Sequence, residues 1–159
     1  MEGVVRKTLF YVGLILLAGL WIYTYEAISG SQPLPARIPT HFDAAGNING
    51  WGEPGMLWLL PALGTGLFVL MTLVAFFPQS FNFPVRPTPA TRPQLEALAL
   101  DMIAWLRAEI AGLFLWIQYM IIASVRAGAS RFSPLFLPVV LLFVFGTIIA
   151  HIVAMIRVR

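Results

Sequence analysis

The residues best suited to chemistry gather in one loop between two apolar segments. They are His41, Asp43, Asn47, Asn49, Trp51 and Glu53. A calcium loop needs several carboxylates and carbonyls at fixed spacing, and a catalytic zinc needs about three strong protein ligands. Two carboxylates, two amides and one imidazole at irregular spacing fit neither pattern. We therefore predict a structural turn network first, contact with a partner or small ligand through His41, Asp43, Asn47, Asn49 and Trp51 second, and no metal.

A second isolated histidine, His151, lies in the last apolar segment. An ionisable residue inside a membrane helix is a candidate for function, and a lone histidine could be the axial ligand of a haem or a chlorophyll-type pigment. The plainer interpretation is a hydrogen-bonded helix contact. The topology derived below puts His41 and His151 on opposite sides of the membrane, so the two cannot share one ion. We predict no cofactor.

Catalysis is not expected. The chain has no cysteine, which excludes a thiol nucleophile, a thiolate metal site and a disulfide. With its two histidines on opposite sides, it offers no combination of nucleophile and base. Arg107 and Glu109 are two residues apart and point to different sides of a helix. We interpret both as side chains that reach toward the membrane interface.

The elements that must position these residues are transmembrane helices. Hydrophobic residues make up 59% of the 159 residues and charged residues 11%, whereas soluble domains contain about 25% charged residues. Four apolar stretches are long enough to cross a bilayer, which takes about 20 helical residues. We predict one all-α membrane domain over 1–159, with helices at about 9–28, 56–77, 92–123 and 134–156 and a small hairpin-like loop at 33–53.

The distribution of basic residues orients the chain. With both termini in the cytoplasm, the inner segments hold Arg6, Lys7, Arg86, Arg92, Arg157 and Arg159, and the outer ones Arg37, Arg126 and Arg131. This bias follows the positive-inside rule and predicts that the loop at 33–53 is extracytoplasmic. The basic residues are scattered at segment ends, which does not favour a nucleic-acid partner. The first helix is too long for the core of a typical signal peptide, and we expect it to remain uncleaved.

Local patterns predict helix starts and contacts. Thr91 and Gln94 form a capping-box pattern at the start of the third helix. That helix begins as an amphipathic segment, which we expect to project into the cytoplasm before it enters lipid near Arg107 and Glu109. Ser133 and Pro134 are typical of the start of the fourth helix. Four small residues at helical spacing, Ala62, Gly66, Gly146 and Ala150, predict close helix packing.

The loop itself has the residues of a tight turn. Asp43-Ala-Ala-Gly46 favours a turn in which the glycine takes a positive φ. Trp51 is suited to the membrane interface. The predicted structure is a small hairpin that caps the outer ends of the helices.

The segment Ile38-Pro-Thr-His-Phe-Asp-Ala-Ala-Gly-Asn-Ile-Asn-Gly-Trp-Gly52, with Pro61 in the following helix, resembles the signature of a bacterial membrane family known only as a domain of unknown function. That domain also forms the N-terminal part of SdpI-type immunity and signalling proteins. The segments Phe81–Val85 and Phe145–Arg157 resemble the short, four-helix members of the family. The resemblance implies the bacterial cytoplasmic membrane and no established reaction.

Two hypotheses about function follow. The protein could be an SdpI-like sensor or immunity-type module whose outer loop recognises a peptide or envelope partner. It could instead be an accessory, structural or cofactor-shielding subunit of a larger, energy-converting membrane complex, in which its apolar helix surface packs laterally. In both cases it acts by contact with other membrane proteins rather than by catalysis.

Overall fold

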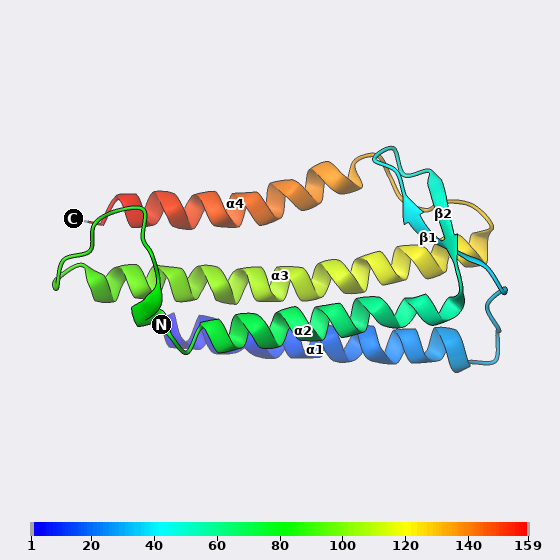
Figure 1. Ribbon diagram of the computed structural model, residues 1–159, viewed down its shortest axis with the longest axis horizontal. Coiled ribbons are helices and arrows are strands. Elements are labelled where there is room, and N and C mark those ends of the chain that lie inside the picture. Colours follow the sequence, from blue (N-terminus) through cyan, green and yellow to red (C-terminus); the bar gives the residue numbers. More distant parts are fainter. Residues whose placement is uncertain (1, 159) are drawn as a thin grey trace.

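A computed structural model describes residues 2–158, and it consists of long helices with a small hairpin at one end (Figure 1). The elements are α1 (Glu2–Ser29), β1 (Ile38–Phe42), β2 (Ile48–Gly52), the 3-10 turn η1 (Pro54–Trp58), α2 (Leu59–Val74), η2 (Pro78–Ser80), α3 (Arg92–Ala127) and α4 (Phe136–Ile156). Within these residues, four helices are long and apolar enough to cross a membrane. The predicted all-α membrane fold with a hairpin between the first two helices is confirmed.

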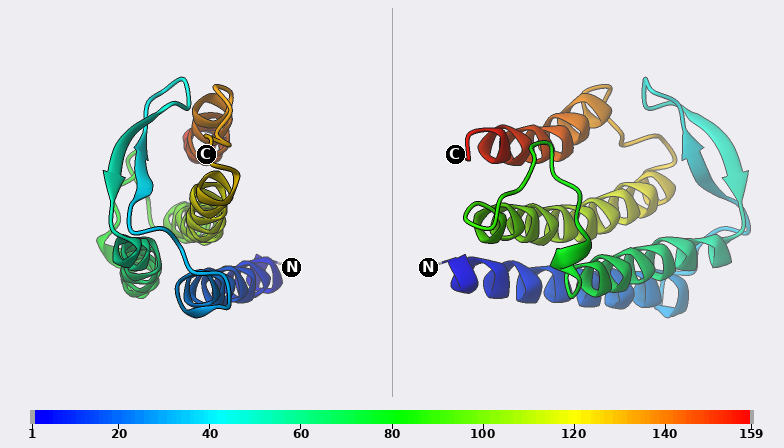
Figure 2. Two further views of the ribbon diagram at one scale, coloured as in Figure 1. Left: turned by 90° about the vertical axis from the view of Figure 1, so that its right-hand side faces the viewer. Right: turned by 60° about the vertical axis from the view of Figure 1, so that its left-hand side comes forward.

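Helix α3 is the centre of the bundle, because it packs against each of the other three helices (Figure 2). The side of α3 that faces α1 includes small residues, of which Ala104 and Ala108 form a buried cluster with Leu9. The bulky Trp105 of the same turns is 44% exposed. This arrangement, with small residues between helices and large apolar residues on the outside, suits a protein surrounded by lipid. In lipid the hydrophobic effect does not drive helices together, and close packing of their backbones does so instead.

The glycines at helix contacts are not the ones predicted. A Cβ added at Gly64 would lie 2.9 Å from a ring carbon of Phe114, and one at Gly13 would lie 2.6 Å from the ring of Phe68. A Cβ added at Gly66 or Gly146 would meet nothing within 4 Å among the described residues.

The predicted packing sites Ala62, Gly66, Gly146 and Ala150 are all exposed. For contacts within the chain, that prediction is therefore wrong. The spacing of small residues identified a helix face, but not whether the face is turned toward a neighbouring helix or toward lipid.

The start of α3 lies where it was expected, at Arg92, but its cap is different. The side chain of Thr91 makes no capping bond to the helix. Instead, Thr88 and Thr91 form a reciprocal pair, in which each backbone N–H donates to the other hydroxyl oxygen, at 3.0 and 3.2 Å. The capping box therefore begins at Thr88, three residues earlier than the predicted Thr91. The turn Pro89–Thr91 leads directly into the helix.

The first turns of α3 do not project as a free extension. Leu95 and Ala99 form a buried cluster with Met155 near the end of α4, and Phe81 and Phe83 of the α2–α3 connection pack against it. The apolar side of this amphipathic segment thus packs against other parts of the chain. At its other end, α3 stops at Gly128, whose φ of 66° is the left-handed conformation of a helix C-cap.

A candidate ligand pocket at the capped end of the bundle

The hairpin over the helix ends is built around Asp43. Strands β1 and β2 pair antiparallel. The Oδ1 atom of Asp43 accepts the backbone N–H groups of Ala45 and Asn47, at 2.9 and 2.8 Å. The N–H of Gly46 donates to the carbonyl of Asp43 at 2.9 Å, and Gly46 has a φ of 87°. The predicted tight turn with a positive-φ glycine is confirmed.

These hydrogen bonds also act on the charge of Asp43. They stabilise the carboxylate form, so the pKa of Asp43 lies below its ordinary value, chiefly through the backbone and side-chain donors of Asn47. The side chain remains exposed. A negative charge is therefore fixed on the tip of the hairpin at neutral pH.

The other candidate residues of the loop are arranged in separate groups. His41 Nδ1 and Asn49 Oδ1 share a hydrogen bond across the two strands. Trp51 lies opposite Pro39 in the strand register and is 55% exposed. Among the described residues, no three His, Asp or Glu side chains are close enough to hold a metal ion. The structure thus divides the predicted set into a turn, a cross-strand pair and an exposed aromatic ring.

The hairpin is fixed to the helix bundle at several points. Ile38 is fully buried in a cluster with Ala27, Leu57 and Ile122. The hydroxyl of Ser130, in the α3–α4 loop, donates to the carbonyl of Gly46. The rings of Phe42 and Phe132 lie with their centroids 4.3 Å apart. The hairpin is consequently part of the same packed unit as the helix ends.

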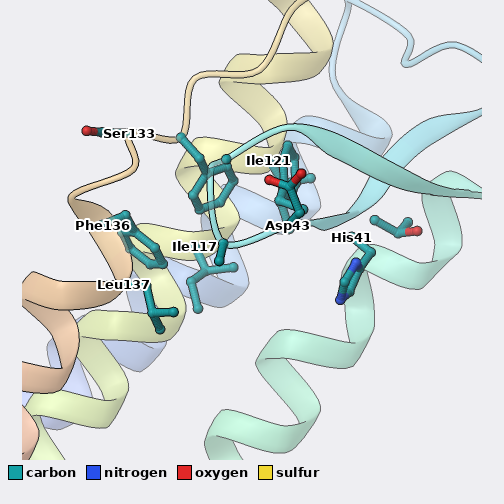
Figure 3. Close-up of a pocket in the computed structure, with 12 residues that line it drawn as sticks. His41, Asp43, Ile117, Ile121, Ser133, Phe136 and Leu137 are labelled. Atoms are coloured by element: carbon teal, nitrogen blue, oxygen red, sulfur yellow. The ribbon is translucent and has the colours of Figure 1, made fainter.

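A cavity of about 310 Å³ lies between the hairpin and the ends of α3 and α4 (Figure 3). Its apolar wall consists of Ile117 and Ile121 from α3 and Phe136 and Leu137 from α4. The hairpin side carries the polar groups, which include His41, Asp43 and Thr40. Ser133 adds a hydroxyl from the α3–α4 loop, because α4 begins at Phe136, three residues after the predicted cap. Ligand pockets typically combine an apolar lining with a few polar groups, in volumes of about 300 to 1,000 Å³.

Sequence reasoning identified only one wall of this pocket. His41 and Asp43 were candidates, whereas Phe132, Phe136 and Leu137 were not, because they lie more than eighty residues further along the chain. One signal was available. Four spans place the α3–α4 loop at the same end as the loop between α1 and α2, and the aromatic pair Phe132 and Phe136 stands at that loop.

His151 lies at the opposite end of the bundle from His41, in the last turns of α4 (Figure 1). Its Nδ1 is 2.8 Å from the carbonyl oxygen of Thr147. This hydrogen bond lies within α4, because Thr147 is four residues earlier in the same helix. The role of His151 as an axial ligand stays an untested prediction.

A buried polar group also ties the helices together below the cap. The Nε2 of Gln118 donates to the hydroxyl of Thr24 at 2.8 Å and to the carbonyl of Leu57 at 3.2 Å, and Gln118 is fully buried. One side chain therefore links α3 to α1 and to η1, directly behind the hairpin. Hydrogen bonds between helices hold membrane bundles together where water cannot compete for the same groups.

The fold and the capped end define the chain as a multi-pass membrane protein with a helix bundle closed at one end by a hairpin. Residues 12–65, about a third of the chain, match the family model of a domain of unknown function (DUF1648). The match covers most of α1, the whole hairpin and the first half of α2. The family resemblance predicted from the loop is confirmed over these residues.

One curated relative is an uncharacterised protein from the archaeon Archaeoglobus fulgidus, which is 34% identical over 86 residues. The aligned part is 49% of this chain and 45% of that protein, so the match spans about half the length of each. No solved structure matches the chain. The comparisons thus show similarity to a domain of unknown function, and the four apolar helices show its membrane character.

Proposed function

We propose that this chain is a non-catalytic membrane protein that recognises an amphipathic segment of an extracytoplasmic partner at its capped end. The observation that carries the proposal is the pocket, in which the hairpin supplies polar groups and α3 and α4 supply an apolar wall. A segment with one or two apolar side chains next to a polar or basic group would match both sides. A volume of about 310 Å³ limits the occupant to a few side chains.

The electrostatics of the rim favour a basic or hydrogen-bond-donating occupant. Asp43, like any aspartate, is ionised at neutral pH, and its hydrogen bonds lower its pKa further. The side chains of His41 and Thr40 add groups that can both donate and accept hydrogen bonds. An SdpI-like sensor or immunity-type role, in which the outer surface meets a peptide, is consistent with this chemistry.

The proposed orientation puts the hairpin outside and both termini in the cytoplasm, as the positive-inside rule predicts. The membrane would be the cytoplasmic (inner) membrane of a bacterium, as the family resemblance implies.

Site-specific photo-crosslinking tests the pocket. A benzophenone amino acid at Leu137, in the pocket, should give a discrete peptide or protein adduct in cells, identifiable by mass spectrometry. The same amino acid at Leu142, on α4 and 72% exposed, is the matched control and should give lipid adducts. The same adducts at both positions, or lipid alone at both, would reject recognition at the pocket.

A second function, that of an accessory subunit in a larger membrane complex, has its own supporting observation. Helix α4 packs mainly on α3 (Figure 2). Only 6% of its most apolar 18-residue stretch is buried. An exposed helix of this kind offers a large surface for lateral packing. Purification in mild detergent tests the idea, since stoichiometric subunits should co-purify, whereas a small monodisperse particle would contradict it.

A further inference from the structure

A groove between α3 and α4 contains a carboxylate that the proposed function does not use. The groove has a volume of about 490 Å³ and is lined by Trp105 and Glu109 of α3 and by Phe143, Thr147 and His151 of α4. A smaller hollow of about 220 Å³ also includes Glu109 and Phe143 and reaches Trp116. Glu109 is thus common to two adjoining depressions on one side of the bundle.

The carboxylate lies beside the middle of α4. Glu109 Oε1 accepts the hydroxyl of Thr147 at 2.5 Å. Thr147 is about 16 Å from the start of α4 at Phe136 and about 14 Å from its end at Ile156, from the helical rise of 1.5 Å per residue. Arg107, two residues earlier, lies beside Phe10 near the start of α1 and Thr72 near the end of α2, so the sequence-based expectation that Glu109 lies near the point of entry into lipid stays a prediction.

Glu109 forms no salt bridge within the described part of the chain, and His151, which lines the same groove, is the other titratable side chain in its lining. The Oε2 atom of Glu109 is buried and has no hydrogen-bond partner among residues 3–158. Arg107, two residues earlier, is directed elsewhere. Its guanidinium lies 4.8 Å from the ring centre of Phe10 and 5.0 Å from that of Phe68, and it donates to Thr72.

A carboxylate in apolar surroundings is costly unless a proton or a cation compensates it. The groove also offers aromatic surface for a cation: Trp105, Trp116 and Phe143 are 44%, 52% and 64% exposed. Aromatic faces attract organic cations, most strongly where water is excluded. Gly146, which has open space above it, leaves room for a bulky group beside the carboxylate.

We propose that this groove binds a lipophilic organic cation, such as a quaternary ammonium or phosphonium compound, with Glu109 as its counter-charge. The apolar arms of the cation would contact the aromatic side chains, and the groove would be reached from within the lipid. This site is independent of the pocket at the capped end.

The test is equilibrium binding of radiolabelled tetraphenylphosphonium to the full chain purified in dodecyl maltoside. We expect saturable binding of about one cation per chain. Glu109→Gln removes the charge while keeping an oxygen for Thr147, and we expect the affinity to fall at least tenfold. Glu109→Asp keeps the charge and should retain more of the affinity than Glu109→Gln. Gly146→Leu should also weaken binding by filling the groove.

Three controls make the outcome decisive. Glu53→Gln changes an exposed carboxylate at the capped end and should bind like the parent. Tetraphenylborate is an anion of the same shape and cannot pair with a carboxylate. It should therefore only partition into the detergent micelle, without saturable binding. Thermal melts and gel filtration establish that each variant is folded. Saturable binding that is unchanged in folded Glu109→Gln, or non-saturable binding of both ions to the parent, would overturn the proposal.

Discussion

The hydroxyl of Ser130 donates to the carbonyl of Gly46, and so the turn of the hairpin is bonded to the loop between α3 and α4. The contact joins residues 84 positions apart in the sequence. It holds the hairpin over the helix ends, and Gly46 itself lines the pocket. The position of Gly46 therefore affects both the turn and the cavity.

Gly46→Val should destabilise the protein by about 1–2 kcal/mol or more, because the left-handed conformation is costly for a residue with a Cβ. A Cβ there would also lie 2.6 Å from the carbonyl oxygen of Phe132. Thermal unfolding in detergent measures the effect. Gly55→Val is the control, since a Cβ at Gly55 meets nothing within 4 Å among the described residues. Equal melting temperatures for the two variants would contradict the role of Gly46.

Gly64→Leu and Gly66→Leu, two residues apart on α2, should behave differently. At Gly64 the new side chain must displace Phe114 and Leu17, and overpacking of this kind costs about 1–3 kcal/mol. At Gly66 there is open space, so stability should be nearly unchanged. The measurement is again thermal stability in detergent. Equal loss in both variants would mean that the face of α2 carrying Gly66 is also in contact.

Gln118→Leu should lower stability by about 1–3 kcal/mol, because the carbonyl of Leu57 loses its donor in a buried site. Thr24 keeps its own bond to the carbonyl of Leu20. The loss should appear as a lower melting temperature. Leu142→Ala, at a position that is 72% exposed, serves as the control and should change little. A Gln118→Leu variant as stable as the parent would exclude a structural role for this link.

Asp43→Ala should destabilise the hairpin at neutral pH and less so in acid. The folded-state pKa of Asp43 is lowered, so its contribution is fully present above the unfolded pKa of about 3.9 and is lost as the pH falls through the lower folded value. The difference in melting temperature between parent and variant should therefore shrink below about pH 4. A difference that is constant from pH 7 to the acid limit would show that the carboxylate charge is unimportant.

The membrane orientation can be tested with single cysteines, since the chain has none of its own. Ala45 and Ala90 are both exposed and lie in connections at opposite ends of the bundle (Figure 1). A cysteine at Ala45 should react with an impermeant maleimide added to intact cells, and one at Ala90 should react only after permeabilisation. The reverse pattern would invert the proposed topology.

The sequence alone determined the class of fold, the four spans and the turn of the hairpin. Each of these follows from local properties: the length of an apolar run decides whether a helix can cross lipid, and the residues from Asp43 to Gly46 decide the turn. The family resemblance came from the same continuous segment. Local patterns of this kind need no knowledge of which helix faces which.

Only the tertiary structure decided the contacts between distant segments. Small residues occur on several helix faces, and the sequence could not distinguish Gly64, which meets Phe114, from Gly66, which meets open space. The wall of the pocket formed by Phe136 and Leu137, and the position of Glu109 beside Thr147, likewise depend on how α4 packs on α3. In a protein surrounded by lipid, apolar side chains are stable on either side of a helix. Hydrophobicity therefore gives no direction to the packing, and shape and hydrogen bonding decide it.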